Sequence, residues 1–391
     1  MRIGDLGPLC HSTVIISPEY PPDIGGVSFF SEILANVLAA EGTNVWVISS
    51  SVAPTTLEGP IKVIADPRIF QIKRLIKLDA STTLAPKYSR IFLQWVPHGF
   101  GYKSLNLFFV LWVAWRVLFR SNPLWLMVHE PFLEFGGNFR VKIASLVHRV
   151  MIWILLRLAS RAFASNRKWI EKINGWKPDS LLVEILPVPS TILENNNPGK
   201  NLIPVCEEED FESWKKKPIG HFGTFGHNTV RYLEKIIPGV LNKSKGSSFL
   251  LIGKGSQEFR NKLILKNPEL ASRVAATGSL GNSELIKRVS ECSVMVQVCE
   301  GGVSFRNTSI MAALSLAKPV VANSGLFTER EWHDWDSVNL CNDNDFHGLI
   351  DNIQFLVDNP KSAIKKGLKN FEIYHENFSK EKILEVLKKG F

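Results

Sequence analysis

The sequence predicts an α/β protein of two doubly wound domains with a cleft between them, because strand and helix patterns alternate in two successive halves. Glycine-bearing turns follow the strands in both halves. The 391 residues suffice for two domains that each bury a core. We predict domains at 1–200 and 201–375, and a C-terminal helix at 376–391 that can return to the first domain. An irregular connection at 195–210, rich in Asn and acidic residues, separates the halves.

Apolar runs with a period of two or of 3.6 place the elements of the first half. Strands are predicted at 11–17, 45–49, 61–65, 91–96, 124–128, 161–165 and 182–186, and helices at 28–41, 105–119 and 141–163. Gly25 and Gly26 precede the first helix, where glycine lets a substrate approach the backbone. The apolar run 105–119 is shorter than the ~20 residues of a membrane span, which favours a buried or interfacial helix.

The second half repeats the alternation and contains the most informative stretch, 300–325. Its strands are predicted at 219–222, 249–252, 274–277, 294–298 and 319–322, and its helices at 229–243, at 283–291 and from about Ser304. Helix N-termini expose unpaired N–H groups and attract anions. Two interpretations remain open for this helix start. Arg306 could hold a diphosphate there, or Ser, Thr and Asn are ordinary capping residues.

A histidine and a glutamate end the predicted strand 124–128. His129 and Glu130 therefore stand at the carboxyl end of a strand, where open α/β sheets bind ligands. A lone histidine at such a place is often structural. The glycine-bearing loop that follows favours a functional role.

The net charge of +9 is concentrated in one segment, 101–180, which holds 12 Lys or Arg, four acids and six of the 11 Trp. The helix 141–163 is expected to bury Ile143, Val150 and their helical neighbours. Its other face carries Arg149, Trp153, Arg157 and Arg161. This face is either an ordinary solvated face or a docking site for an anionic membrane surface. No recognisable nucleic-acid-binding motif accompanies the charge, so no nucleic-acid partner is expected.

Several classes of protein can be set aside. The five cysteines lack metal-ligand spacing and suit a reducing cytoplasm. The first residues lack the features of a signal peptide. No nucleophile elbow, HExxH motif or P-loop occurs, and no metal site is predicted. The expected location is the cytoplasm, with peripheral attachment to the inner face of the membrane as an extension.

Seven features, in their order along the chain, resemble those of GT-B glycosyltransferases of family four. They are PPDIGGV, HGFG, HEPF, GHFGTFG, LLIGKGS, the strand end at Thr277 and Gly278, and GGVSFRNTSIMAALSLAKPVVANSG. The resemblance spans nearly the whole chain. It implies two Rossmann-like domains, a nucleotide-sugar held mainly by the second and an acceptor held mainly by the first. The implied transfer is metal-independent and usually retains the anomeric configuration. The donor is a substrate, and no cofactor is implied.

The residues at the predicted strand ends and loops, taken together with the resemblance, give the expected site. His129 and Glu130 are expected to be catalytic, beside the transferred sugar, and His98 is expected on the acceptor side. The expected donor-binding residues are Gly25, Gly26, Gly223, Thr224, His227, Lys254, Gly302, Ser304, Arg306, Asn307, Thr308 and Ser309.

The sequence departs from the family pattern at the donor site. Ser304 and Ala312 stand where family members commonly have two glutamates, and the usual Arg and Lys after the first strand of the second domain are missing. Arg306 in a GVSxR-type loop resembles a variant subgroup, which suggests a relocated grip on the diphosphate. Two functions follow. One is a glycosyltransferase acting on a lipid-linked or cell-surface glycan, and the other is a degenerate scaffold that binds a sugar nucleotide or a partner without turnover.

Overall fold

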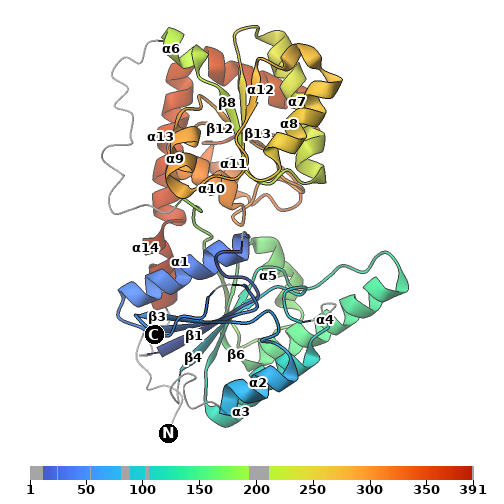
Figure 1. Ribbon diagram of the computed structural model, residues 1–391, viewed down its shortest axis with the longest axis vertical. Coiled ribbons are helices and arrows are strands. Elements are labelled where there is room, and N and C mark those ends of the chain that lie inside the picture. Colours follow the sequence, from blue (N-terminus) through green and yellow to red (C-terminus); the bar gives the residue numbers. More distant parts are fainter. Residues whose placement is uncertain are drawn as a thin grey trace. The chain divides into compact units, whose positions relative to one another are not determined.

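The structure is a computed structural model that describes residues 12–23, 25–52, 54–80, 89–101, 105–192 and 211–389. The chain divides into two compact units (Figure 1). Met1–Pro187 and Lys380–Phe391 form the first unit, and Val188–Ser379 form the second. The predicted connection 195–210 and the boundary at 200–201 lie outside the described residues.

A seven-stranded parallel sheet forms the centre of the first unit, in the order β3-β2-β1-β4-β5-β6-β7. Its strands are β1 (Ser12–Ser17), β2 (Asn44–Ser49), β3 (Ile61–Ala65), β4 (Arg90–Trp95), β5 (Leu124–Val128), β6 (Ala159–Ala164) and β7 (Val183–Ile185). Its helices are α1 (Gly26–Ala40), α2 (Ile72–Ala80), α3 (Leu107–Arg120), α4 (Phe139–Leu158), α5 (Arg167–Asn174) and α14 (Lys380–Lys388). Every residue of β1, β4 and β5 is buried, as expected for central parallel strands covered on both faces.

The second unit has a six-stranded parallel sheet in the order β10-β9-β8-β11-β12-β13. Its strands are β8 (Ile219–Phe222), β9 (Phe249–Ile252), β10 (Val274–Ala276), β11 (Met295–Gln297), β12 (Val320–Asn323) and β13 (Asn339–Cys341). Its helices are α6 (Phe211–Lys216), α7 (His227–Lys243), α8 (Ser256–Lys266), α9 (Asn282–Ser290), α10 (Thr308–Ser315), α11 (Glu331–Trp335), α12 (Phe346–Asp358) and α13 (Pro360–Asn377), with a short 3₁₀ turn at Pro268–Leu270. The predicted fold class of two Rossmann-like doubly wound domains is confirmed.

The C-terminal helix α14 packs on the first unit. Arg161 Nη1 donates to the carbonyl oxygen of Leu387 at 2.9 Å, and Lys388 pairs with Glu41 of the segment after α1 at 2.6 Å. The last helix thus belongs to the unit with which the chain begins.

Two predicted helices have different bounds in the structure. The helix expected over 141–163 ends at Leu158, because Ala159 pairs with Leu124 and starts β6. The helix expected from Ser304 starts at Thr308. The four residues before it form a turn in which the Asn307 N–H donates to the Ser304 carbonyl oxygen at 3.0 Å.

The buried face of α4 also differs from the prediction. Ile143 and Val150, expected inside, are exposed, and the buried face instead carries polar and apolar residues together. These are Ser145, His148, Arg149, Met151, Ile152, Leu155 and Leu156. In the described ranges no helix is both long and apolar enough to cross a bilayer.

Candidate active site

The second unit has the arrangement of a ligand-binding sheet. Its strand order reverses between β8 and β11, and open α/β sheets bind ligands outside the carboxyl ends of the strands at such a switch point. The loop 223–226 follows β8, and the loop 298–307 follows β11. Most predicted donor-binding residues lie on these two loops or on the first turn of the helix after each.

Close backbone contacts hold these loops together. A Cβ on Gly253, after β9, would lie 2.2 Å from the Gly223 carbonyl oxygen, so only glycine fits there. A Cβ on Gly223 would lie 3.8 Å from Cβ of Ser309, in the first turn of α10. The loops after β8 and β9 therefore meet each other, and the loop after β8 meets the start of α10. Two predicted donor residues, Gly223 and Ser309, are neighbours.

Two helices begin at the switch point without a capping side chain. Gly226 precedes α7 and Asn307 precedes α10, and neither side chain accepts a hydrogen bond from the first turn. By contrast, Asp345 caps α12 by accepting from the N–H of Gly348. An uncapped N-terminus keeps N–H groups and partial positive charge available for an anion. His227, Thr308 and Ser309 lie in these first turns, while Thr224 and Lys254 are exposed on the neighbouring loops.

In the turn before α10, Phe305 points into the core of the second unit, whereas Arg306 lies at the surface. The ring of Phe305 is buried among Trp332, Trp335 and Phe378, with centroids 5.2–5.8 Å away. The next residue, Arg306, is partly exposed and lies with Cζ 4.6 Å from the ring centroid of Phe327. Anchoring Phe305 inside thus leaves Arg306 at the surface, just before the open helix start.

Three predicted donor residues, Gly302, Ser304 and Asn307, have structural roles in this loop. Ser304 is fully buried, and its N–H and hydroxyl both donate to Asn307 Oδ1, at 2.7 and 3.0 Å. A Cβ on Gly302 would lie 2.2 Å from the Gly325 nitrogen, so this glycine permits contact between two segments of the protein itself. Ser304, Gly302 and the side chain of Asn307 therefore shape the loop before α10.

Glu329 also holds the loop before α10 in place. The sequence did not predict this role. It is 4% exposed, and its carboxylate accepts from the N–H of Phe305 at 3.1 Å and from Trp332 Nε1 at 2.9 Å. Burial raises the pKa of Glu329 to about 7. This carboxyl group therefore changes charge near neutral pH.

His221 in β8 is a second residue that the sequence did not single out. Its Nδ1 lies 2.8 Å from the carbonyl oxygen of Val296, which can only accept, so Nδ1 carries the proton. The buried Nε2 has no hydrogen-bond partner among the described residues, and a Cβ on Gly223 would lie 3.7 Å from it. Burial lowers the pKa of His221 to about 4, so the ring is neutral at pH 7. The one feature of the sequence that could have identified His221 is its place as a polar residue in the apolar strand of the GHFGTFG motif.

The first unit brings its predicted residues together at the ends of β4 and β5. His129 Nε2 lies 2.9 Å from Oε1 of Gln94, a residue missed from the sequence, and the ring of Phe30 in α1 meets it edge-on at 5.2 Å. Burial lowers the pKa of His129 to about 3, so it too is neutral at pH 7. His98 Nε2 lies 3.7 Å from Glu130 Oε2.

The two glycines at the start of α1 differ. A Cβ on Gly25 would lie 2.1 Å from Oε2 of Glu19, whereas a Cβ on Gly26 would meet no atom within 4 Å. Gly25 therefore makes room for a side chain of the protein. Only Gly26 faces open space, where a ligand could approach the backbone.

The predicted membrane-docking face of α4 needs correction. The side chain of Arg149 is 8% exposed and donates to the Leu133 carbonyl oxygen at 2.8 Å. That of Arg161 is 15% exposed and pairs with Glu184 at 2.8 Å. Both have structural roles, because the loop before α4 encloses Arg149, and Arg161 lies on β6 between Glu184 of β7 and the end of α14. Trp153 and Arg157 remain exposed, and they stack on each other at 3.9 Å.

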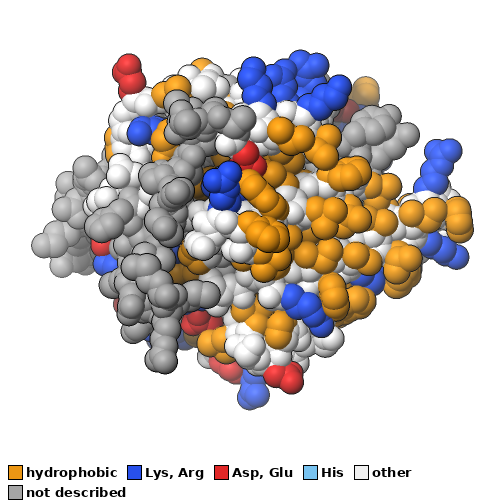
Figure 2. All heavy atoms as spheres, turned by 90° about the horizontal axis from the view of Figure 1, so that it is seen from below, with side chains coloured by type: hydrophobic (Ala, Val, Ile, Leu, Met, Phe, Trp, Pro, Cys, Tyr) orange, Lys and Arg blue, Asp and Glu red, His pale blue; other side chains and the backbone are white. Residues whose placement is uncertain are grey.

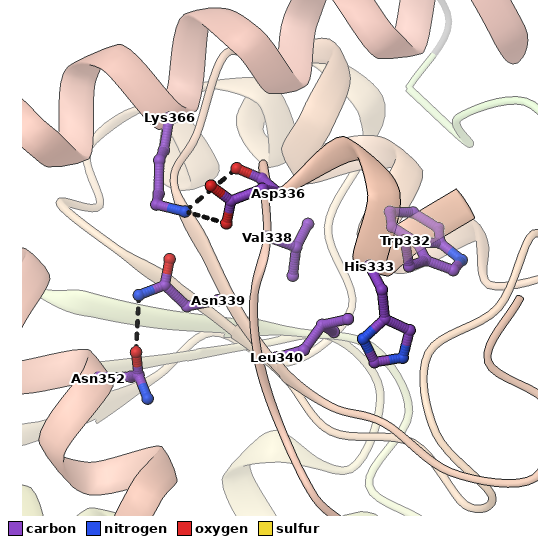
Figure 3. A pocket seen from close by; sticks show the side chains of 8 residues that line it. All are labelled: Trp332, His333, Asp336, Val338, Asn339, Leu340, Asn352 and Lys366. Carbon is purple, nitrogen blue, oxygen red and sulfur yellow. Dashed lines mark hydrogen bonds and ion pairs between the residues drawn. The ribbon is translucent and has the colours of Figure 1, made fainter. Parts of the chain in front are cut away.

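A hollow of about 300 Å³ lies in the second unit beside the start of β13 (Figure 3). Four of its polar side chains are paired with one another: Lys366 with Asp336 at 3.3 Å and Asn339 with Asn352 at 2.7 Å. Its position at the amino end of β13, away from the strand ends at the switch point, excludes it from the candidate site.

Comparisons with known proteins identify the fold. No protein-family model matches the chain, and no curated protein is similar to it. HepE from Anabaena, solved in complex with UDP-glucose, has a TM-score of 0.64 at 14% identity, over 96% of this chain and 98% of HepE. Sucrose-phosphate synthase from Thermosynechococcus elongatus has a TM-score of 0.65 at 14% identity, over 96% and 97%. WaaG, a glycosyltransferase involved in lipopolysaccharide biosynthesis, has a TM-score of 0.64 at 11% identity, over 97% and 100%. The chain therefore has the GT-B fold, as its motifs indicated.

Proposed function

We propose that this chain is a glycosyltransferase that moves a sugar from a nucleotide-sugar to a lipid-linked or cell-surface glycan. The pair of open helix N-termini, α7 and α10, beside the β8–β11 switch point carries the proposal, because a diphosphate suits such a place. HepE was solved with UDP-glucose, and WaaG is a glycosyltransferase of lipopolysaccharide biosynthesis, which supports the same chemistry on this fold.

The donor diphosphate would be held from three sides. Arg306 supplies a planar, permanently charged donor, and Thr308 and Ser309 add hydroxyl and N–H groups from the first turn of α10. Thr224, His227 and Lys254 are exposed on the adjoining loops and supply further donors. This positive charge takes the role that a metal ion has in other transferases, so the proposed reaction is metal-independent and needs no cofactor.

The first unit would supply the groups around the transferred sugar and the acceptor. A neutral His129 can form hydrogen bonds with sugar hydroxyls without adding charge, and Glu130 with His98 forms a polar pair at the next strand end. Retention of the anomeric configuration follows from the resemblance to family four. A cytoplasmic protein on the inner face of the membrane, with no nucleic-acid partner, suits a lipid-linked acceptor.

One observation favours the alternative of a degenerate scaffold that binds a sugar nucleotide or a partner without turnover. Ser304 and Ala312, which stand at the positions of the two family glutamates, are both fully buried. Neither position offers a carboxylate to the donor sugar or the ribose. Turnover would then depend on other groups, foremost His129.

The test is to incubate the purified protein with a panel of nucleotide-sugars, with and without lipid-linked acceptors, and to measure nucleotide release. We expect turnover with one donor, and a loss of about 10²–10³-fold for His129→Ala with little change in nucleotide affinity. His347→Ala, at an exposed position of α12, is the matched control. Nucleotide binding without turnover across the panel would instead establish the scaffold.

A further inference from the structure

The first unit exposes an unusual amount of apolar surface. Among the described residues, 20 large hydrophobic side chains are exposed, and 14 of them lie on α2, α3 and α4 or directly before α3 and α4. They are Ile72, Ile76, Leu105, Leu107, Phe108, Leu111, Leu118, Phe119, Phe135, Phe139, Ile143, Leu146, Val150 and Trp153, which we call the apolar face. Figure 2 shows hydrophobic side chains gathered over one side of the molecule. Contiguous apolar surface of this kind marks an interaction site.

The helical spacing explains why the apolar face is continuous. On α4 its members follow one another at intervals of four and three residues, from Phe139 through Leu146 to Trp153. On α3, Phe108, Leu111 and Leu118 are three and seven residues apart, which keeps them on one side of the helix. Since α3 packs against both α4 and α2, the outward faces of the three helices join. These side chains have no place in the core of their own unit, which is filled from the opposite face of each helix.

The charges around the apolar face indicate its partner. The three helices carry a single acid, Asp79, and nine basic residues: Lys73, Arg74, Lys77, Arg116, Arg120, Arg140, Lys142, Arg149 and Arg157. Asp79 forms an ion pair with Arg116, with 2.7 Å between Oδ1 and Nη1. Six of these cations are exposed: Lys73, Lys77, Arg120, Arg140, Lys142 and Arg157. Figure 2 shows Lys and Arg side chains beside the hydrophobic ones on this side of the molecule. A second copy of this chain would bring like charges face to face, whereas an anionic lipid surface complements them.

We propose that the apolar face docks on an anionic bilayer as a monotopic surface, with its helices lying in the interface. Phe108, Phe119, Phe139 and Leu146 enter the acyl boundary, and the flanking cations bind lipid headgroups. Trp153, stacked on Arg157, lies at the headgroup level, where indole rings concentrate. The inference deepens the proposed membrane association and does not rest on sugar transfer. It differs from a purely electrostatic docking in that apolar insertion resists salt.

Sedimentation with vesicles of phosphatidylcholine and phosphatidylglycerol tests the docking. Phe119→Glu/Leu146→Glu places two charges on the apolar face at exposed positions, and we expect about a hundredfold lower vesicle partition, roughly tenfold for each side chain. Phe355→Glu/Leu265→Glu changes the same residue types at exposed positions of α12 and α8 and should bind like the wild type. Wild-type binding should persist in part at 1 M salt.

Other results would overturn the inference. Equal partition of the two double variants removes the apolar face as the docking site, and complete release of the wild type by salt removes insertion. If the wild type is a dimer that does not bind vesicles, and Phe119→Glu/Leu146→Glu is a monomer, the apolar face contacts a second copy of the chain.

Melting temperature and nucleotide affinity are measured on every variant. An intact nucleotide affinity beside lost vesicle binding separates the docking from the fate of the transferase proposal. If that variant does not fold, Ile72→Glu/Phe139→Glu tests the same face.

Discussion

At the scale of single residues, the loop before α10 shows how a buried neighbour can position a functional side chain. Phe305 is held by an aromatic cluster and by Glu329, so the following residue, Arg306, is carried to the surface beside an open helix start. The guanidinium can form two parallel hydrogen bonds to phosphate oxygens, which a lysine cannot reproduce.

Arg306 should therefore contribute to nucleoside-diphosphate affinity. We expect Arg306→Ala to weaken binding by about 1.5–3 kcal/mol, which is one to two decades, and Arg306→Lys to weaken it less. Titration calorimetry on the wild type and both variants measures the effect. Arg330→Ala, at a largely exposed position of the same unit, is the control. Identical affinities in all four proteins would exclude Arg306 from the donor site.

Sequence reasoning succeeded for residues whose position follows from a strand end. His98, His129 and Glu130 each follow an apolar strand, and β4 and β5 are neighbours, so His98 meets Glu130. It failed where contacts with residues distant in sequence determine whether a side chain is buried. Arg149 is buried because the Leu133 carbonyl oxygen and the rings of Phe132 and Phe135 enclose it.

At the scale of elements, periodicity placed the strands well but could not orient α4. Apolar residues occur on nearly every side of this helix, so two faces compete for the core. The structure buries the face that contains Ser145 and His148 and leaves Ile143 and Val150 outside. The polar groups of the buried face find partners, since Ser145 Oγ donates to the Leu133 carbonyl oxygen at 2.7 Å. Such pairing is invisible to a hydrophobic pattern.

Glu329 makes the loop before α10 sensitive to pH. Its folded pKa of about 7 lies above the ordinary value of 4.5, so the folded state binds the proton more tightly than the unfolded state does. The contribution of this group to stability is complete below about pH 4.5 and is lost as the pH rises through 7, by about 3 kcal/mol at most.

Glu329→Gln should abolish that loss. An amide oxygen at the position of Oε2 can accept from both Phe305 N–H and Trp332 Nε1–H, as the protonated acid does. We expect the variant to melt above the wild type at pH 8.5 and close to it at pH 4.5, as followed by calorimetry. Glu269→Gln, at an exposed site, should show no such pH-dependent gain. A gain of equal size at both pH values would mean that ionisation of Glu329 is not the cause.

At the scale of the whole molecule, the two units repeat one design. Each sheet reverses its strand order once, between β1 and β4 or between β8 and β11. Each has a neutral histidine near that place, the partly buried His129 or the buried His221. The alternation of elements along the sequence was enough to predict two such units. The strand order and the neutral histidines were not predictable, because both depend on which strands become neighbours.

In the second unit, the titrations of His221 and Glu329 should change stability with pH in opposite directions. The folded pKa of His221, about 4, lies below its ordinary 6.5, so the unfolded state binds more protons between these values, and His221 makes stability rise with pH there. Glu329 makes stability fall with pH from about 4.5 to 7. Between about pH 4.5 and 6.5 the two slopes have opposite sign and similar size, so they nearly cancel.

Replacing either Glu329 or His221 should reveal the pH dependence of stability that the other residue contributes. We expect the hydrogen-exchange protection of β8 and β11 to change little in the wild type between pH 4.5 and 6.5, after correction for intrinsic exchange. In Glu329→Gln it should rise with pH, because His221 alone remains, and in His221→Gln it should fall with pH, because Glu329 alone remains. The double variant should again be nearly flat. Peptides from β4 and β5 of the first unit serve as the internal reference, since these substitutions leave His129 unchanged. Slopes of the same sign in both single variants would refute the balance, because the two groups would then not be the titrating pair.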